Sequence, residues 1–296
     1  MPTKITVKKK NHAMMIVDSE PSVLNELTDF FTFYVPGYKF MPAYKNKVWD
    51  GKIRLYNSQT RELYAGLYAY VKEFANAEGR DYELELEHDA YYGYVDEQTN
   101  PDMSFVNELN FTDNKGNSIE PRDYQLKAIE YALKNKRGML ISPTASGKSL
   151  IIYILLQWYL NNYNKRALII VPTTSLVEQM YSDFAAYGSN DDIFNIDDYQ
   201  RIYSGMPKKS EMPRVIISTW QSIYKLPGAW FEQFGCVFGD EAHNFKAKSL
   251  TSILTKLRDA EYRFGTTGTL DGTQTHKLVL EGLFGPAYYV TTTKDL

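Results

Sequence analysis

The sequence that decides the fold reads Met139-Leu140-Ile141-Ser142-Pro143-Thr144-Ala145-Ser146-Gly147-Lys148-Ser149. An apolar run leads into a loop of small residues, and a second apolar run, 150–156, follows it. This order predicts a strand, a tight loop and a helix, which is the setting of a phosphate-binding loop. In such a loop, backbone N–H groups and the positive end of the helix dipole bind an anion.

Each residue of this loop has a predicted role. Lys148 is expected to reach the β- and γ-phosphates of ATP, and the Ser149 hydroxyl is expected to bind Mg²⁺. Ser142 stands where the full pattern has glycine, so the loop alone leaves an ordinary helix start open. The residues expected to bind the nucleotide are Pro143, Thr144, Ala145, Ser146, Gly147, Lys148 and Ser149.

A pair of carboxylates, Asp240-Glu241, follows the apolar run 236–239. Adjacent carboxylates at the end of a buried strand are costly unless a cation meets them, and a magnesium nucleotide supplies one. Asp240 is expected to hold Mg²⁺, and Glu241 to orient or deprotonate the attacking water. With Lys148 they form the predicted catalytic set, although the pair alone is also compatible with a plain turn.

From residue 121 onward, predicted helices alternate with short apolar strands. Strands of this kind, separated by helices, indicate an α/β fold with a parallel sheet covered on both faces. Ligands of such sheets bind at the carboxyl ends of the strands, where both motifs fall. The predicted helices are 122–135, 149–162 and 174–187, and the predicted strands are 138–142, 167–171, 215–218, 236–239 and 262–265.

The first 90 residues predict a small α+β domain. Apolar spacing indicates helices at about 21–34 and 66–77 and a strand at 82–86, and a short apolar run, 12–17, precedes the first helix. Between them, Asp50-Gly51 predicts the turn of a hairpin spanning 39–61.

The predicted hairpin is basic and aromatic. Six lysines and arginines lie in 39–61 against one acid, Asp50, with Tyr44, Trp49 and Tyr56 interleaved. Lysines bind phosphate and aromatic rings stack on bases, so nucleic-acid binding is one interpretation. A solvated hairpin whose aromatics pack inward is the other. The residues expected to contact nucleic acid here are Lys45, Lys47, Trp49, Lys52 and Arg54.

The composition bounds the remaining possibilities. Residues 81–120 hold eleven acids and one base, Lys115, which predicts a linker over 91–120 between domains at 1–90 and 121–296. The net charge of −3 confines any nucleic-acid surface to a local patch, and a single cysteine excludes an intramolecular disulfide. With no signal peptide or long apolar run, we expect a soluble, cytoplasmic protein.

Several of these motifs resemble those of one protein family. Asp240-Glu241-Ala242-His243 matches the motif that names the DEAH-type members of helicase superfamily 2. Four more segments resemble that family's motifs in the same order: 122–125, 171–179, 218–222 and 266–269. The resemblance implies that residues 121–296 form a RecA-like ATP-binding domain, the first of the two that such motors contain.

The resemblance also implies roles for individual residues. Arg122 and Gln125 would contact adenine. A second set would touch the nucleic-acid backbone, and a third would couple ATP hydrolysis to strand movement. The backbone set is Pro172, Thr173 and Thr219, and the coupling set is His243, Thr267 and Thr269.

Within the superfamily, the motif sequences and the basic hairpin are most similar to those of phage recombination helicases. This implies an ATP- and Mg²⁺-dependent helicase or translocase acting on branched DNA, duplex DNA or RNA–DNA hybrids in recombination and fork rescue, in the host cytoplasm if phage-encoded. Such motors take an arginine finger from a second RecA-like domain, and only 27 residues follow Thr269. We therefore expect an amino-terminal portion with little hydrolysis of its own. The alternatives are an RNA helicase, a restriction-enzyme motor subunit, or a module that binds ATP or DNA without turnover.

Overall fold

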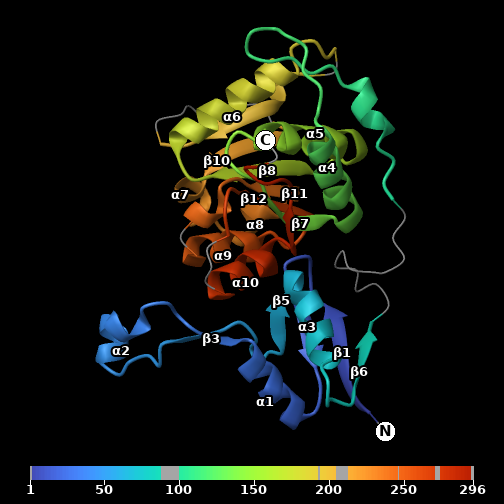
Figure 1. Ribbon diagram of the computed structural model, residues 1–296. Coiled ribbons are helices and arrows are strands. Elements are labelled where there is room, and N and C mark those ends of the chain that lie inside the picture. The colour runs from blue at the N-terminus through green and yellow to red at the C-terminus, as the bar shows by residue number, and fades with distance from the viewer. Residues whose placement is uncertain are drawn as a thin grey trace.

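The computed structural model describes residues 2–87, 100–192, 194–204, 213–245, 247–270 and 274–294. It shows a larger α/β part stacked on a smaller amino-terminal part (Figure 1). A bent extension that ends in α2 projects from the smaller part, to the left in Figure 1.

The larger part is built on a seven-stranded sheet in the order β13-β7-β12-β11-β8-β10-β9, with every neighbouring pair parallel. This confirms the predicted α/β class. The edge strands β9 and β13 were missed, because their polar and aromatic residues do not form continuous apolar runs. The strands are β7 Arg137–Ile141, β8 Arg166–Val171, β9 Tyr199–Ile202, β10 Val215–Thr219, β11 Phe234–Gly239, β12 Tyr262–Thr267 and β13 Ala287–Tyr289.

Helices cover both faces of this sheet. Three helices pack on one face, around a core that contains Leu140, Ile169 and Phe238. The others pack on the opposite face, around a core that contains Met139, Leu168 and Val237. The first group is α4 Asp123–Asn135, α5 Lys148–Asn162 and α6 Thr174–Tyr187; the second is α7 Trp220–Ile223, α8 Gly228–Phe231, α9 Ala247–Lys256 and α10 Gln274–Leu283, and the short 3₁₀ turns are η4 Ile196–Asp198 and η5 Ala242–Asn244.

The smaller part is a four-stranded mixed sheet in the order β5-β2-β1-β6. Strands β1, β2 and β5 were not predicted, although β2 overlaps the apolar run at 12–17. The predicted helix at 21–34 ends earlier, at Phe30, because residues 32–34 form a strand that pairs with 52–54. The elements are β1 Thr3–Lys9, β2 Met14–Asp18, α1 Pro21–Phe30, β3 Thr32–Tyr34, η1 Tyr38–Phe40, α2 Pro42–Lys45, β4 Lys52–Arg54, β5 Glu62–Tyr64, η2 Ala65–Leu67, α3 Tyr68–Ala75 and β6 Tyr82–Leu86.

The predicted hairpin turn at Asp50-Gly51 is wrong. Strand β4 pairs with β3, and the chain between them, including η1 and α2, forms the projecting extension, which we call the arm (residues 32–54). Gly51 has a different role: its φ is 81°, and a Cβ there would lie 2.3 Å from the Tyr38 ring. The glycine therefore lets an aromatic ring lie directly on the backbone.

The two parts share one hydrophobic core and a close helix contact. Ile5 and Phe74 of the smaller part belong to the same cluster as Phe284 of the larger. Gly66 packs against the backbone of α10, where a Cβ would lie 2.0 Å from the Glu281 carbonyl oxygen. The Glu281 carboxylate, 4% exposed, accepts a 2.6 Å hydrogen bond from the Tyr70 hydroxyl. Because this contact is buried and bonded, it holds the smaller part firmly beneath α10.

The acidic segment before α4 is more structured than predicted. Residues 91–99 of the predicted linker lie outside the described residues. Further on, η3 Ser104–Glu108 is followed by a bridge between Thr112 and Ser118. Val106 and Phe111 are buried against the larger part. Two apolar side chains therefore hold the segment against the larger part. The count of acidic residues over 81–120 did not reveal this contact.

Candidate functional site

The loop between β7 and α5 makes a tight turn with two residues in the left-handed conformation. Gly147, just before α5, has φ 76°, and Ala145 has φ 67°. A Cβ at Gly147 would lie 2.4 Å from Nε2 of Gln125, so glycine is required there for space as well as for conformation. Thr144 is exposed at the tip, and the Pro143 carbonyl accepts a 2.7 Å hydrogen bond from the Ser146 hydroxyl.

The structure explains the serine at the first position of the loop. The hydroxyl groups of Ser142 and Ser146 lie 2.5 Å apart, and both residues are buried. The Ser142 N–H donates to the Thr267 carbonyl on β12, at 2.8 Å. The departure from the glycine pattern therefore adds a hydrogen bond inside the loop.

Gln125 is hydrogen-bonded to the loop. Its carbonyl oxygen accepts from the Arg122 N–H at 2.8 Å, and its amide donates to the carbonyls of Ser146 at 3.0 Å and Gly147 at 3.3 Å. With 4% exposure and its amide bonded to two loop carbonyls, Gln125 braces the loop, and its contact with adenine stays a prediction. The Tyr124 hydroxyl, which we did not single out, also donates to the Ser146 carbonyl, while Arg122 remains exposed beside it.

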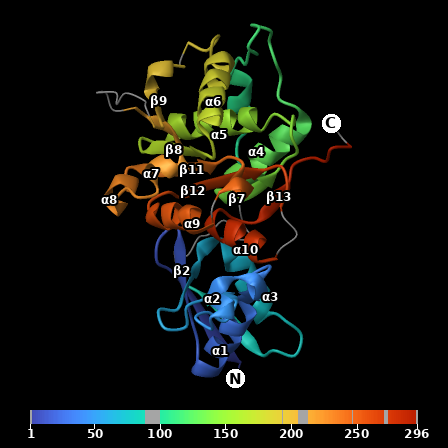
Figure 2. The same ribbon diagram turned by 90° about the vertical axis from the view of Figure 1, so that its left-hand side faces the viewer.

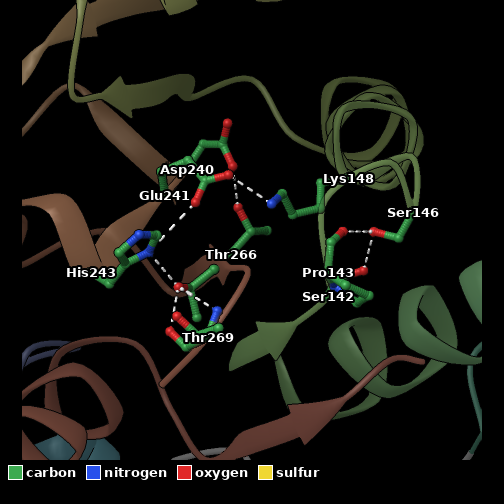
Figure 3. Close-up of polar contacts among 10 residues, drawn as sticks. Ser142, Pro143, Ser146, Lys148, Asp240, Glu241, His243, Thr266 and Thr269 are labelled. Carbon is green, nitrogen blue, oxygen red and sulfur yellow. Dashed lines mark hydrogen bonds and ion pairs between the residues drawn. The ribbon is translucent and has the colours of Figure 1, made fainter. Parts of the chain in front are cut away.

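The strand-end carboxylates meet the loop, as Figure 3 shows. Lys148 Nζ lies 2.6 Å from Glu241 Oε1, with side-chain exposures of 11% and 23%. The Thr266 hydroxyl at the end of β12 donates to Asp240 Oδ1 at 2.5 Å. Thr266 was not among the predicted site residues. Three strand ends thus bring a lysine, two carboxylates and a hydroxyl together.

The electrostatics of this cluster favour a cation. Burial raises the pKa of Asp240, and the neighbouring Glu241 adds to that rise, while the Thr266 hydrogen bond and Lys148 oppose it. A carboxylate that is 7% exposed is stabilised in its charged form by a divalent ion, for which carboxylate oxygen is a suitable ligand. The residues present therefore fit a Mg²⁺ site at Asp240.

A polar chain leads from this cluster to the next motif. His243 Nδ1 lies 2.6 Å from the Thr267 hydroxyl and 3.5 Å from Glu241 Oε2 (Figure 3). The Thr267 hydroxyl in turn donates to the Thr269 carbonyl at 2.7 Å. His243 therefore contacts the 266–269 segment through a hydrogen bond and lies next to Glu241, so it connects the carboxylate to that segment.

Ser149, the second predicted metal ligand, points elsewhere. Its hydroxyl lies 2.8 Å from the hydroxyl of Tyr187 on α6. A role as a Mg²⁺ ligand beside Asp240 thus requires the Ser149 side chain to leave Tyr187. In this structure the predicted pair of metal ligands is not assembled.

We predict that Tyr187→Phe tightens binding of Mg²⁺·ATP. The substitution removes one of the two side-chain hydrogen bonds that hold Ser149 at α6, the other being to Asp183, and a neutral hydrogen bond contributes about 0.5–1.5 kcal/mol, or about 2- to 13-fold in affinity. Titration calorimetry of ATP with and without Mg²⁺ checks this. Because only the metal ligand is freed, metal-free ATP should bind unchanged. Weaker Mg²⁺·ATP binding by the variant would contradict the prediction.

The predicted nucleic-acid residues of the larger part lie on neighbouring strand ends, after β8 and β10. The Gln221 side chain donates to the Pro172 carbonyl at 3.3 Å, which joins the two segments. Thr173 is exposed, and its hydroxyl caps α6. Thr219 is only 5% exposed and its hydroxyl is bonded to Ser222, so this side chain does not face a backbone phosphate here.

The five amino-terminal residues predicted to contact nucleic acid all lie in the arm, but their side chains differ in exposure and in bonding. Within the described residues, Lys45 and Lys47 are exposed and have no ion-pair partner. Lys52 lies over the Tyr34 ring, and Arg54 pairs with Asp50 at 2.5 Å. Trp49 donates its indole N–H to the Lys52 carbonyl, so it also has a structural role.

Two family models match the chain. Residues 118–272 match the family described as type III restriction enzyme, res subunit. Residues 4–87 match the family described as DNA helicase UvsW, N-terminal. The chain therefore belongs to helicase superfamily 2, which confirms the predicted family.

Within that family the chain is homologous to the ATP-dependent DNA helicase UvsW of Enterobacteria phage T4. The two are 35% identical over 292 residues, which cover 95% of this chain and 55% of the T4 helicase. One crystal structure of T4 UvsW matches with a TM-score of 0.84, at 33% identity over 97% of this chain and 99% of that one. Another matches with a TM-score of 0.85, at 32% identity over 98% of this chain and 57% of that one.

A more distant relative is a DNA 3'-5' translocase, XPB2, of Sulfurisphaera tokodaii. It is 26% identical over 178 residues, which cover 60% of this chain and 37% of the translocase. The chain thus spans little more than half of the T4 helicase, and less of the translocase. Among the described residues, every helix is too short or too polar to cross a bilayer.

Proposed function

We propose that this chain provides the ATP-binding and DNA-contacting portion of a helicase or translocase that acts on branched DNA or R-loops in recombination and fork rescue. The observation that carries the proposal is the ion pair between Lys148 and Glu241, which joins the loop after β7 to the carboxylates that follow β11. Homology to the T4 helicase supports DNA as the substrate.

The site suggests how its residues act on ATP. The phosphate oxygens of ATP would replace Glu241 as the partner of Lys148, because the triphosphate carries more negative charge than one carboxylate. Glu241, once released, is free to position the attacking water. Asp240 and, after rotation, Ser149 would hold Mg²⁺, which when bound neutralises charge on the phosphates. His243 would transmit the release of Glu241 to Thr267.

The nucleic-acid contacts are proposed on two surfaces. Pro172 and Thr173 lie on one segment of the strand-end edge, and Lys45 and Lys47 lie on the arm. The arm extends to the left in Figure 1, the side on which α7 also lies, and Figure 2 turns that side toward the viewer. One branched DNA molecule can thus meet both surfaces from a single side.

Binding of three substrates by this chain tests the proposal. We expect forked DNA and an R-loop to bind more tightly than an RNA duplex, and Lys45→Glu with Lys47→Glu to weaken DNA binding and its salt dependence. Lys115→Glu with Lys127→Glu, at two exposed lysines in and before α4, is the matched charge control. Preference for the RNA duplex would favour an RNA helicase instead.

We also propose that this chain alone hydrolyses ATP slowly. In the family it belongs to, an arginine from the second RecA-like domain stabilises charge on the transferred phosphoryl group, and such an arginine is worth about 10³- to 10⁵-fold in rate. DNA-stimulated hydrolysis should therefore be close to background. Turnover at several per second by this chain would contradict the proposal.

A further inference from the structure

The arm holds a hollow that the phosphate contacts alone do not explain. It has a volume of about 500 Å³ and is lined by lysines, two aromatic rings and one aliphatic side chain. That volume lies within the usual range of small-molecule sites, about 300–1,000 Å³. The lining residues used below are Lys39, Tyr44, Lys45, Lys47, Val48 and Trp49.

The hollow is built by specific contacts. The N–H groups of Val48 and Trp49 both donate to the Ala43 carbonyl, at 2.9 and 3.2 Å, which folds the chain back after α2. Lys47 takes a left-handed conformation, φ 55°, to make this reversal. The indole N–H of Trp49 then fixes its ring against the Lys52 carbonyl at 2.9 Å.

The aromatic rings form a supported row. Tyr34 stacks on Tyr38 with centroids 4.6 Å apart, and Tyr38 meets Tyr44 edge-on at 4.8 Å. Tyr38 lies on the bare backbone of Gly51, so the row has a rigid floor. Tyr44, at its end, lines the hollow.

The charge of the hollow selects an anion. Three lysines line it, and its one acid, Asp50, is paired with Arg54 at 2.5 Å. Exposed apolar surface gathers here as well. Seven large apolar side chains are exposed in the described part of the chain, and four of them belong to the arm: Tyr34, Phe40, Met41 and Val48.

We propose that this hollow binds one unstacked nucleotide of a DNA strand, with its base against Tyr44, Trp49 and Val48 and its phosphate on the lysines. A paired duplex presents phosphates and base edges, but its base faces are covered by neighbours. A nucleotide at a branch point has lost its partner, and its π-face can stack on an aromatic ring. The inference rests on the proposed role of the arm in DNA binding and gives it a preference for branch points.

The test uses the complete chain and two forked DNA molecules. One carries a single unpaired 2-aminopurine at the branch point, and the other carries an abasic site there. Stacking of one base contributes about 1–3 kcal/mol, so the intact fork should bind about 5- to 150-fold more tightly, and its 2-aminopurine fluorescence should be quenched.

Three variants assign this difference to the hollow. Tyr44→Ala should bind both forks equally, at the affinity that the unaltered chain has for the abasic fork. Tyr44→Phe keeps the ring and should keep the preference, which separates stacking from loss of the arm's fold. Tyr289→Ala, an exposed tyrosine on β13, is the matched control and should behave as the unaltered chain.

The outcomes separate this inference from the proposed function. Equal affinity of the unaltered chain for both forks overturns the nucleotide site. If Lys45→Glu with Lys47→Glu still weakens both forks equally, the arm binds DNA through phosphates alone, and the proposed function stands. If that charge reversal also has no effect, both the nucleotide site and the DNA-binding role of the arm are overturned.

Discussion

Lys148→Ala is expected to weaken ATP binding by about 30-fold or more. The Lys148 ammonium group lies beside the loop and pairs with the Glu241 carboxylate, and both side chains are partly buried. Removing one partner of a buried charged contact costs about 2–5 kcal/mol, and each 1.4 kcal/mol is tenfold in affinity. Equilibrium titration with a fluorescent ATP analogue measures the loss.

Two further variants make this result specific. Lys165→Ala removes a lysine that pairs with Asp259 at 2.7 Å and is half exposed, so ATP affinity should stay unchanged. Glu241→Gln removes the competing carboxylate, so ATP binding should be equal or tighter while any DNA-stimulated hydrolysis is lost. Unchanged affinity in Lys148→Ala would refute the nucleotide site itself.

Arg263→Met is expected to destabilise the chain by about 4 kcal/mol or more. The guanidinium is fully buried and donates to four backbone carbonyls, those of Leu254, Leu257, Ala260 and Leu283. These lie at or just beyond the carboxyl ends of α9 and α10, where carbonyls lack intrahelical partners and the helix dipole is negative. Burial lowers the pKa of Arg263, and the four carbonyls offset that cost.

The free energy of unfolding in urea checks this prediction. Each buried carbonyl left without a donor costs about 1–3 kcal/mol, so the apolar replacement should be severe. Arg258→Met replaces an exposed arginine of the neighbouring turn and should change stability by about 0.5 kcal/mol or less. Arg263→Lys retains a charge but fewer donors and should fall between the two. Equal midpoints for the two methionine variants would show that the carbonyl contacts contribute nothing.

The residues of the candidate ATP site could be proposed from the sequence because they fall in short local motifs. Lys148 and Ser149 follow Gly147 directly in the chain, and Asp240 and Glu241 end one apolar strand, so the two motifs together indicated their proposed roles. The Gln125 amide shows the limit: its partners, Ser146 and Gly147, lie more than twenty positions away. No local pattern distinguishes bracing a loop from contacting a base.

The arm shows the same limit more strongly. Asp50-Gly51 has the composition of a hairpin turn, yet strand β4 pairs with β3, eighteen or more residues back. Packing explains the glycine at position 51, because the Tyr38 ring lies where a side chain would be. Thr219 was likewise a motif residue whose burial only the fold reveals.

The sequence by itself therefore determined the parallel sheet, the small-residue loop proposed to bind phosphate and the pair of carboxylates at a strand end, because alternating apolar runs and small-residue loops encode them within a few residues. Only the tertiary structure decided that Lys148 meets Glu241, that Ser149 turns to Tyr187 and that Tyr44 and Trp49 enclose a hollow. Those contacts join residues from separate elements, and their free energies depend on distances and burial that the chain acquires only when it folds.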